Sequence, residues 1–146
     1  MRVINRKARY DYNLLEKFEA GIVLTGAEVK SAKLGRIKLE DSFIRVDHNL
    51  EAWLVNAHIH PYSFANNKNY QPTKSRKLLL HRKEILSLVK KMEGKNMSIV
   101  PTLCYQKKGK IKLQLALAKG KKSFQKKEKK RKQDLDREME RDLKNF

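Results

Sequence analysis

Several features are scarce in this chain of 146 residues, and each scarcity excludes a class of protein. The single cysteine, Cys104, excludes an internal disulfide and gives no metal-binding spacing, which suits a reducing cytosol. No apolar run approaches the roughly 18 residues of a membrane span. The N-terminal stretch from Met1 to Tyr12 is polar and basic, without a signal-peptide pattern. We therefore expect a cytoplasmic protein with no membrane partner.

Acidic residues are also scarce relative to basic ones. The chain has 35 Lys+Arg against 16 Asp+Glu, which gives a formal net charge of +19. A charge of this size says little about the fold but indicates a polyanionic partner. A membrane-surface helix would place aromatic residues on its apolar face, whereas Trp53 lies in a strand-like alternation. The polyanion is therefore predicted to be nucleic acid.

Residues arranged for catalysis are scarce as well. His58 and His60 would point to one face of an extended segment, but no third metal ligand accompanies them. Glu40-Asp41 precedes a predicted strand and is typical of a turn or cap, and Cys104 lies in an apolar strand. No glycine-rich phosphate loop is present. We expect no catalytic site, no metal site and no cofactor.

The first 118 residues alternate in ways that predict strands. Two hairpins are indicated, Ser42–Val46 with Ala52–Ala57 and Met97–Tyr105 with Lys110–Ala118, each around a turn-rich link. Two helices are predicted, one from Thr25 that Gly35 ends and one over Arg82–Met92. The pattern favours a mainly β oligonucleotide-binding (OB) fold, an antiparallel barrel of about six strands with short flanking helices. An open α+β sheet is the alternative.

Composition changes near Lys119, which divides the chain into a core of residues 1–118 and a basic C-terminal tail of residues 119–146. The tail has too few apolar residues to offset its ordering entropy, so we expect it to be disordered when free. Leu135, Met139 and Leu143 recur every four residues, which predicts a helix when the tail binds a partner. A polar loop over residues 61–73 has no assigned structure, and loops of this length are often functional.

Basic residues gather in several clusters along the chain: near the N-terminus, on the first predicted helix, after the polar loop, in the last hairpin and in the tail. Each cluster alone is also consistent with an ordinary solvated face. Together they predict strongly salt-dependent phosphate binding. The chain shows no helix-turn-helix, zinc finger or basic zipper, and small barrels often bind unpaired RNA, so RNA is favoured over DNA.

Ordered blocks of sequence then indicate a family. Phe18-Glu19-Ala20-Gly21-Ile22 is followed by Leu24-Thr25-Gly26-Ala27-Glu28-Val29-Lys30-Ser31, and Asn5-Arg6-Lys7-Ala8-Arg9 precedes both. Pro72-Thr73-Lys74-Ser75-Arg76-Lys77-Leu78-Leu79-Leu80 and Ala118-Lys119-Gly120-Lys121-Lys122 come later in the same order. These blocks closely resemble the SmpB (SsrA-binding protein) family.

The resemblance implies a six-stranded OB barrel that binds the tRNA-like domain of transfer-messenger RNA (tmRNA). It implies delivery of that RNA, with elongation factor Tu as an indirect partner, to stalled ribosomes for trans-translation. The tail would occupy the decoding centre and the messenger channel, where it would be helical. Two rivals are a basic ribosomal or initiation protein with the same barrel, and an RNA-processing enzyme with a metal site or acid pair.

The resemblance also implies site residues. Those expected to bind RNA are Asn5, Arg6, Lys7, Glu19, Lys30, Ser31, Lys33, Arg76, Lys77, Leu79 and Lys110. Those expected to act in the tail are Lys119, Gly120, Lys121, Lys122, Phe124, Lys126, Lys127, Lys130 and Arg131. Gln125-Lys126-Lys127 departs from the family's common Asp-Lys-Arg, which changes an acidic contact and loses bidentate recognition by an arginine.

Physical roles can be assigned to four of these residues, of which Lys110 is expected to contact phosphate. The Glu19 carboxylate can accept hydrogen bonds from base or ribose donors, or else form an ordinary surface ion pair. Leu79 can pack on an exposed base, or else belong to the core. Phe124 is expected to stack on a base of the decoding centre.

Overall fold

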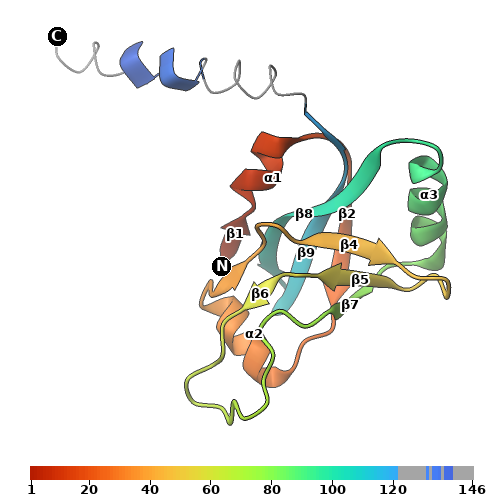
Figure 1. Ribbon diagram of the computed structural model, residues 1–146. Coiled ribbons are helices and arrows are strands. Elements are labelled where there is room, and N and C mark those ends of the chain that lie inside the picture. The colour runs from red at the N-terminus through yellow and green to blue at the C-terminus, as the bar shows by residue number, and fades with distance from the viewer. Residues whose placement is uncertain (122–130, 132, 136, 140–146) are drawn as a thin grey trace.

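A closed antiparallel sheet organises the computed structural model, which describes residues 1–121, 131, 133–135 and 137–139 (Figure 1). The helices among these residues are α1 (Arg6–Asp11), α2 (Gly26–Lys33) and α3 (Arg82–Met92). The strands are β1 (Arg2–Ile4), β2 (Tyr12–Ile22), β3 (Ile37–Lys38), β4 (Phe43–Val46), β5 (Ala52–Val55), β6 (His58–Ile59), β7 (Arg76–Leu79), β8 (Met97–Lys107) and β9 (Lys110–Gly120).

Hydrogen bonding within the described residues closes six of these strands into a ring. The order is β8-β4-β5-β7-β2-β9, and β9 pairs back onto β8. β1 pairs with β8 at Leu103–Tyr105, along the edge that β4 uses at Ile99, and β3 pairs with β6 as a separate ribbon. The predicted OB-type barrel with short flanking helices is confirmed, and the open α+β sheet is wrong. Closure leaves the ring without a long unpaired edge.

Turn chemistry explains why both predicted hairpins form. β4 and β5 pair antiparallel, and Asp47 Oδ1 accepts hydrogen bonds from the backbone N–H groups of Asn49 and Glu51 in the link between them. In the β8–β9 turn, Lys108 and Gly109 have φ of 50° and 77°. Two successive positive φ values are typical of a type I′ turn, whose twist matches that of the flanking strands.

The two predicted helices are confirmed with their boundaries. Thr25 caps α2: its Oγ1 accepts from Glu28 N at 3.2 Å, while Glu28 Oε1 accepts from Thr25 N at 3.0 Å. This reciprocal pair is a capping box. Gly35, at φ 75°, follows the end of α2, and α3 covers the predicted Arg82–Met92.

The N-terminal region contains structure that the sequence did not predict. β2 begins at Tyr12, and β1 and α1 precede it. A register shift between Leu14 and Glu16 interrupts the pairing of β2 with β9. This bulge bends the strand around the barrel and breaks the alternation of side chains.

The barrel interior is apolar, as the alternation in the last strand predicted. Ile111, Leu113, Leu115 and Leu117 are all buried, and Cys104 is buried among them as a core residue. A small second cluster lies outside the ring, where Ala8 of α1 packs on Val100 and Ala118. α1 therefore covers part of the outer surface of β8 and β9.

The tail is described at residues 131, 133–135 and 137–139, which are helical. Leu135 and Met139 are exposed there. β9 continues past the predicted boundary at residue 118 and ends at Gly120. The division of the chain at that boundary and the disorder of the free tail stay predictions.

Candidate nucleic-acid interface

Outward-facing residues of β2, β7, β8 and β9 form one continuous surface. Because side chains alternate along strands, the inward residues of β9 leave Lys110, Lys112 and Gln114 on the outside. Gly21 pairs with both Leu79 and Lys112, and Lys112 pairs with Tyr105. We call this surface the binding face. Its side chains are those of Glu19, Lys77, Leu79, Tyr105, Lys107, Lys110 and Lys112.

The middle of the binding face is hollowed around an exposed leucine. Leu79 is 56% exposed although it lies in a strand of the barrel. A Cβ at Gly21 would lie 3.2 Å from the Leu79 Cβ and 3.6 Å from the Lys112 Nζ, so only glycine leaves the present spacing. A hollow of about 560 Å³ opens here, lined also by His81 and Arg82 where α3 begins. The core alternative for Leu79 is therefore wrong.

Glu19 places an acid on this basic face and is held by two partners. The Tyr105 hydroxyl donates a hydrogen bond to Glu19, and the Lys107 Nζ lies 3.4 Å from its carboxylate. The hydrogen bond from Tyr105 is the main reason that the pKa of Glu19 is lowered. Burial, followed by this same hydrogen bond, raises the pKa of Tyr105 to about 12. At neutral pH the face thus presents a carboxylate acceptor beside a phenol that keeps its proton.

Arg76 is not on the binding face, and its predicted contact with RNA stays a prediction. Only 2% of Arg76 is exposed, because odd-numbered residues of β7 face out and Arg76 faces in. Its Nη2 lies 2.7 Å from Glu28 Oε2, and its Nη1 donates to Ala57 O at 2.8 Å. Tyr70 joins the network through its hydroxyl, 3.2 Å from Glu28 Oε2. The guanidinium therefore ties α2 to β7 and to the segment before β6.

This network also sets the charge of Glu28. Burial would raise the pKa of Glu28, but hydrogen bonds from Thr25 and Arg76 outweigh it, so the pKa is lowered. The pair is thus ionised and buried, with its hydrogen bonds satisfied by neighbouring groups.

Asn5 and Ser31 are buried too, and their predicted contacts with RNA likewise stay predictions. The Asn5 Nδ2 donates to Pro101 O at 2.7 Å and to Leu39 O at 3.2 Å, while its Oδ1 accepts from Ala8 N at 3.1 Å. Asn5 therefore caps α1 and fastens it to β8. Ser31 is fully buried on the inner side of α2, where its small size allows close packing.

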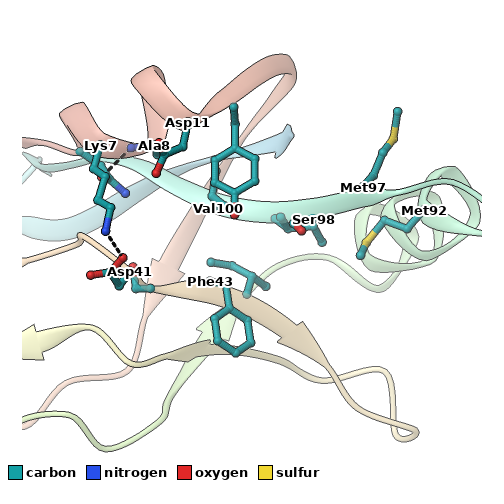
Figure 2. A pocket seen from close by; sticks show the side chains of 14 residues that line it. Lys7, Ala8, Asp11, Asp41, Phe43, Met92, Met97, Ser98 and Val100 are labelled. Carbon is teal, nitrogen blue, oxygen red and sulfur yellow. Dashed lines mark hydrogen bonds and ion pairs between the residues drawn. The ribbon is translucent and has the colours of Figure 1, made fainter. Parts of the chain in front are cut away.

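The remaining predicted residues of the core are exposed but lie apart from the binding face. Arg6 and Lys7 are on α1, and Lys30 and Lys33 are on α2, at the other end of the barrel in Figure 1. Figure 2 shows Lys7 paired with Asp41 at a pocket of about 450 Å³ between α1, β4 and β8. The hydrogen bond to Asp41 is the main reason that the pKa of Lys7 is raised.

The predicted tail residues divide into two groups. Lys119 and Gly120 end β9, and Lys121 follows with its backbone N bonded to Asp11 O and its Nζ to Arg9 O. Arg131 is exposed in the helical part. Lys122, Phe124, Lys126, Lys127 and Lys130 lie outside the described residues.

Tyr105 is the functional candidate that sequence reasoning missed. It is an aromatic residue two positions before Lys107 in a basic hairpin, a pattern that signals base stacking or hydrogen bonding to RNA. Within the residues that the structure describes, no group of three or more His, Cys, Asp or Glu is placed to hold a metal ion. Across the same residues, none of the helices has the length and apolar character needed to cross a membrane.

Comparison with known proteins assigns the chain to a family. The family model for SmpB protein matches residues 2–145. An SsrA-binding protein of Sulfurihydrogenibium sp. is 50% identical over 140 residues, which cover 96% of this chain and 91% of the relative. One from Carboxydothermus hydrogenoformans is 49% identical, covering 96% and 93%.

A solved structure agrees in fold. It carries the description "tmRNA-SmpB: a journey to the center of the bacterial ribosome" and superposes with a TM-score of 0.70 at 42% identity, over 84% of this chain and 85% of that one. With a family match over nearly the whole chain and close relatives of matching length, the chain belongs to the SmpB family of SsrA-binding proteins.

Proposed function

We propose that this protein binds the tRNA-like domain of tmRNA through the binding face and delivers it to stalled ribosomes for trans-translation. The carrying observation is Leu79, a leucine kept 56% exposed at the centre of a lysine-rich surface. The relatives of this chain are named SsrA-binding proteins, and the solved structure that it resembles is described with tmRNA and the bacterial ribosome. Family membership favours this function over the rival of a general ribosomal or initiation protein.

Recognition rather than reaction is the chemistry that the binding face supports. Lys77, Lys110 and Lys112 supply cations for phosphates. The Glu19 carboxylate supplies an acceptor for base or ribose donors, and Leu79 supplies an apolar contact for an unstacked base. The protein acts without a catalytic step of its own, as an RNA-binding factor in the cytoplasm.

The tail has a separate role in this proposal. The basic residues after β9 enter the decoding centre and the messenger channel, where Phe124 stacks on a base. The apolar stripe that includes Leu135 and Met139 is exposed where it is described, which leaves it available for a partner. The indirect encounter with elongation factor Tu through the tmRNA complex stays a prediction.

The test is the affinity for the isolated tRNA-like domain of a Leu79→Ala variant. The substitution removes the apolar contact of this side chain with the RNA. It is expected to weaken the binding free energy by about 1–2 kcal/mol, which lowers the affinity roughly five- to thirty-fold. Leu86→Ala is the matched control, because Leu86 is 47% exposed on α3 and does not line the hollow. Equal affinities of the two variants for this RNA would contradict the role of the binding face in RNA binding.

A further inference from the structure

The loop between β6 and β7 carries an aromatic pair that the binding face does not use. Phe64 is 87% exposed, the most exposed large apolar side chain reported among the described residues. Its ring meets that of Tyr62 edge-on, with the centroids 5.5 Å apart. A phenylalanine that stays this exposed contributes little burial free energy to folding, which indicates a role in binding a partner.

The loop is built to hold Phe64 in place. Within it, Asn67 Nδ2 donates to Tyr62 O at 2.8 Å and Ala65 N donates to the same oxygen at 3.1 Å. At its root, the Tyr70 hydroxyl donates to Ile59 O at 2.9 Å and contacts Glu28. Hydrogen bonds on both sides of Phe64 therefore fix the turn that presents it, which lowers the entropic cost of binding there.

The surroundings of the aromatic pair are cationic. Lys30 Nζ of α2 lies 5.4 Å from the centroid of the Tyr62 ring, and Lys68 is exposed within the loop itself. The sequence from residue 52 to residue 83 contains no Asp or Glu. Glu28, the acid of α2, is buried and paired with Arg76. A ligand here meets cations and a ring face with no exposed carboxylate nearby on these segments.

This chemistry fits one class of ligand. Unpaired nucleotides stack bases on aromatic rings while lysines meet the adjoining phosphates. The loop also carries Asn66, whose exposed amide suits a base edge. An apolar protein partner would need a contiguous apolar patch, and the neighbours of Phe64 are polar or small.

We propose that Tyr62, Phe64 and Lys30 form a second RNA site that takes an unpaired base and its flanking phosphates. The site rests on the proposed function only in that the ligand is RNA. In Figure 1 the loop projects beside α2, at the end of the molecule away from α1. Glu19 and Leu79 lie on β2 and β7 and line a hollow that does not include these three residues, so this site is additional to the binding face.

The test uses the full chain and a single-stranded oligoadenylate of about eight nucleotides as the probe, within the range that such sites cover. Phe64→Ala and Phe64→Leu should each weaken binding roughly five- to one-hundred-fold, because stacking needs a planar ring. Phe64→Trp should keep the affinity, and its added fluorescence should be quenched by the oligonucleotide. Phe43, 43% exposed beside Asp11 and Asp41, gives the matched controls Phe43→Ala and Phe43→Trp.

The controls separate this site from the charge of the whole chain. Phe43→Ala should bind as the unchanged protein does, and Phe43→Trp should show no quenching. Phe64→Leu binding as tightly as the unchanged protein would overturn the inference, as would equal quenching in both tryptophan variants. An intact preference for the tRNA-like domain without an effect of Phe64 would overturn this inference alone. If the Phe64 variants bind the oligonucleotide more weakly but the protein shows no preference for the tRNA-like domain, the proposed function alone would be overturned.

Discussion

Arg76 and Lys77 are adjacent in a cluster that the sequence presents as uniformly basic, and the structure separates them sharply. Arg76→Met should destabilise the protein, because it removes the closer ion pair of the buried Glu28 carboxylate, leaves it the longer 3.7 Å contact with Lys74 Nζ, and frees Ala57 O. Removing one partner of a buried pair costs about 3–5 kcal/mol. That is a large part of a typical total stability of about 5–15 kcal/mol.

Lys77→Met is the matched control. Lys77 is exposed, and its Nζ lies 3.8 Å from Glu51, a surface pair worth about 0–1 kcal/mol. Urea unfolding measures both variants without the ionic screening that guanidinium adds. The effects on RNA binding should be the opposite of those on stability. Lys77→Met should lower the salt dependence of RNA affinity by about one phosphate contact, whereas Arg76→Met should leave that dependence unchanged.

The pH dependence gives this prediction a sign. The pKa of Glu28 is lowered in the folded protein below its ordinary 4.5, so its contribution is present above that pH and lost as the pH falls through the folded pKa. Arg76→Met removes two of the causes that lower this pKa and leaves those from Thr25 and Lys74, so acid costs the variant less stability through Glu28. The gap in unfolding midpoint should therefore narrow between neutral and acidic pH. Unchanged unfolding of Arg76→Met combined with weakened RNA binding would refute the structural role.

Three further outcomes follow from the same structure. A chain ending after Lys121, which keeps the bond of its backbone N to Asp11, should retain binding to the tRNA-like domain but lose tagging in a stalled-ribosome assay. Normal tagging would contradict the assigned role of the tail. The Cys104 thiol, whose pKa burial raises to about 12, should react with thiol reagents only as fast as the barrel opens, so rapid labelling of the folded protein would contradict its burial. Tyr105→Phe removes the main cause of the lowered pKa of Glu19, so a carboxyl titration followed by NMR should show that pKa rising; an unchanged value would contradict the hydrogen bond.

Sequence patterns predicted the barrel where local signals and tertiary contacts agree. The turn at Lys108-Gly109 and the helix cap at Thr25 are local signals that agree with the tertiary fold. The first part of β2 escaped prediction because its bulge near Leu14 breaks the period-2 alternation, and because Leu15 is exposed there. α1 escaped because it covers its cluster with little more than Ala8.

The site was predicted less well, for a geometric reason. A basic block does not say which of its residues face the solvent, since neighbours in a strand point to opposite sides. Leu79 and Arg76 are therefore the reverse of what their residue types suggest, because the leucine is exposed and the arginine is buried. Asn5 shows the same effect, because its cap and clamp on β8 depend on a strand nearly a hundred residues away.

The binding face is proposed to prefer the folded tRNA-like domain over other RNA of equal charge. The most direct measurement is the affinity of the full chain for that domain and for an unrelated RNA of equal length, titrated across salt. We expect parallel salt slopes with a constant advantage for the tRNA-like domain, since both RNAs share the phosphate contacts and only that domain gains the contacts of Glu19 and Leu79. Equal affinities at every salt concentration would contradict it.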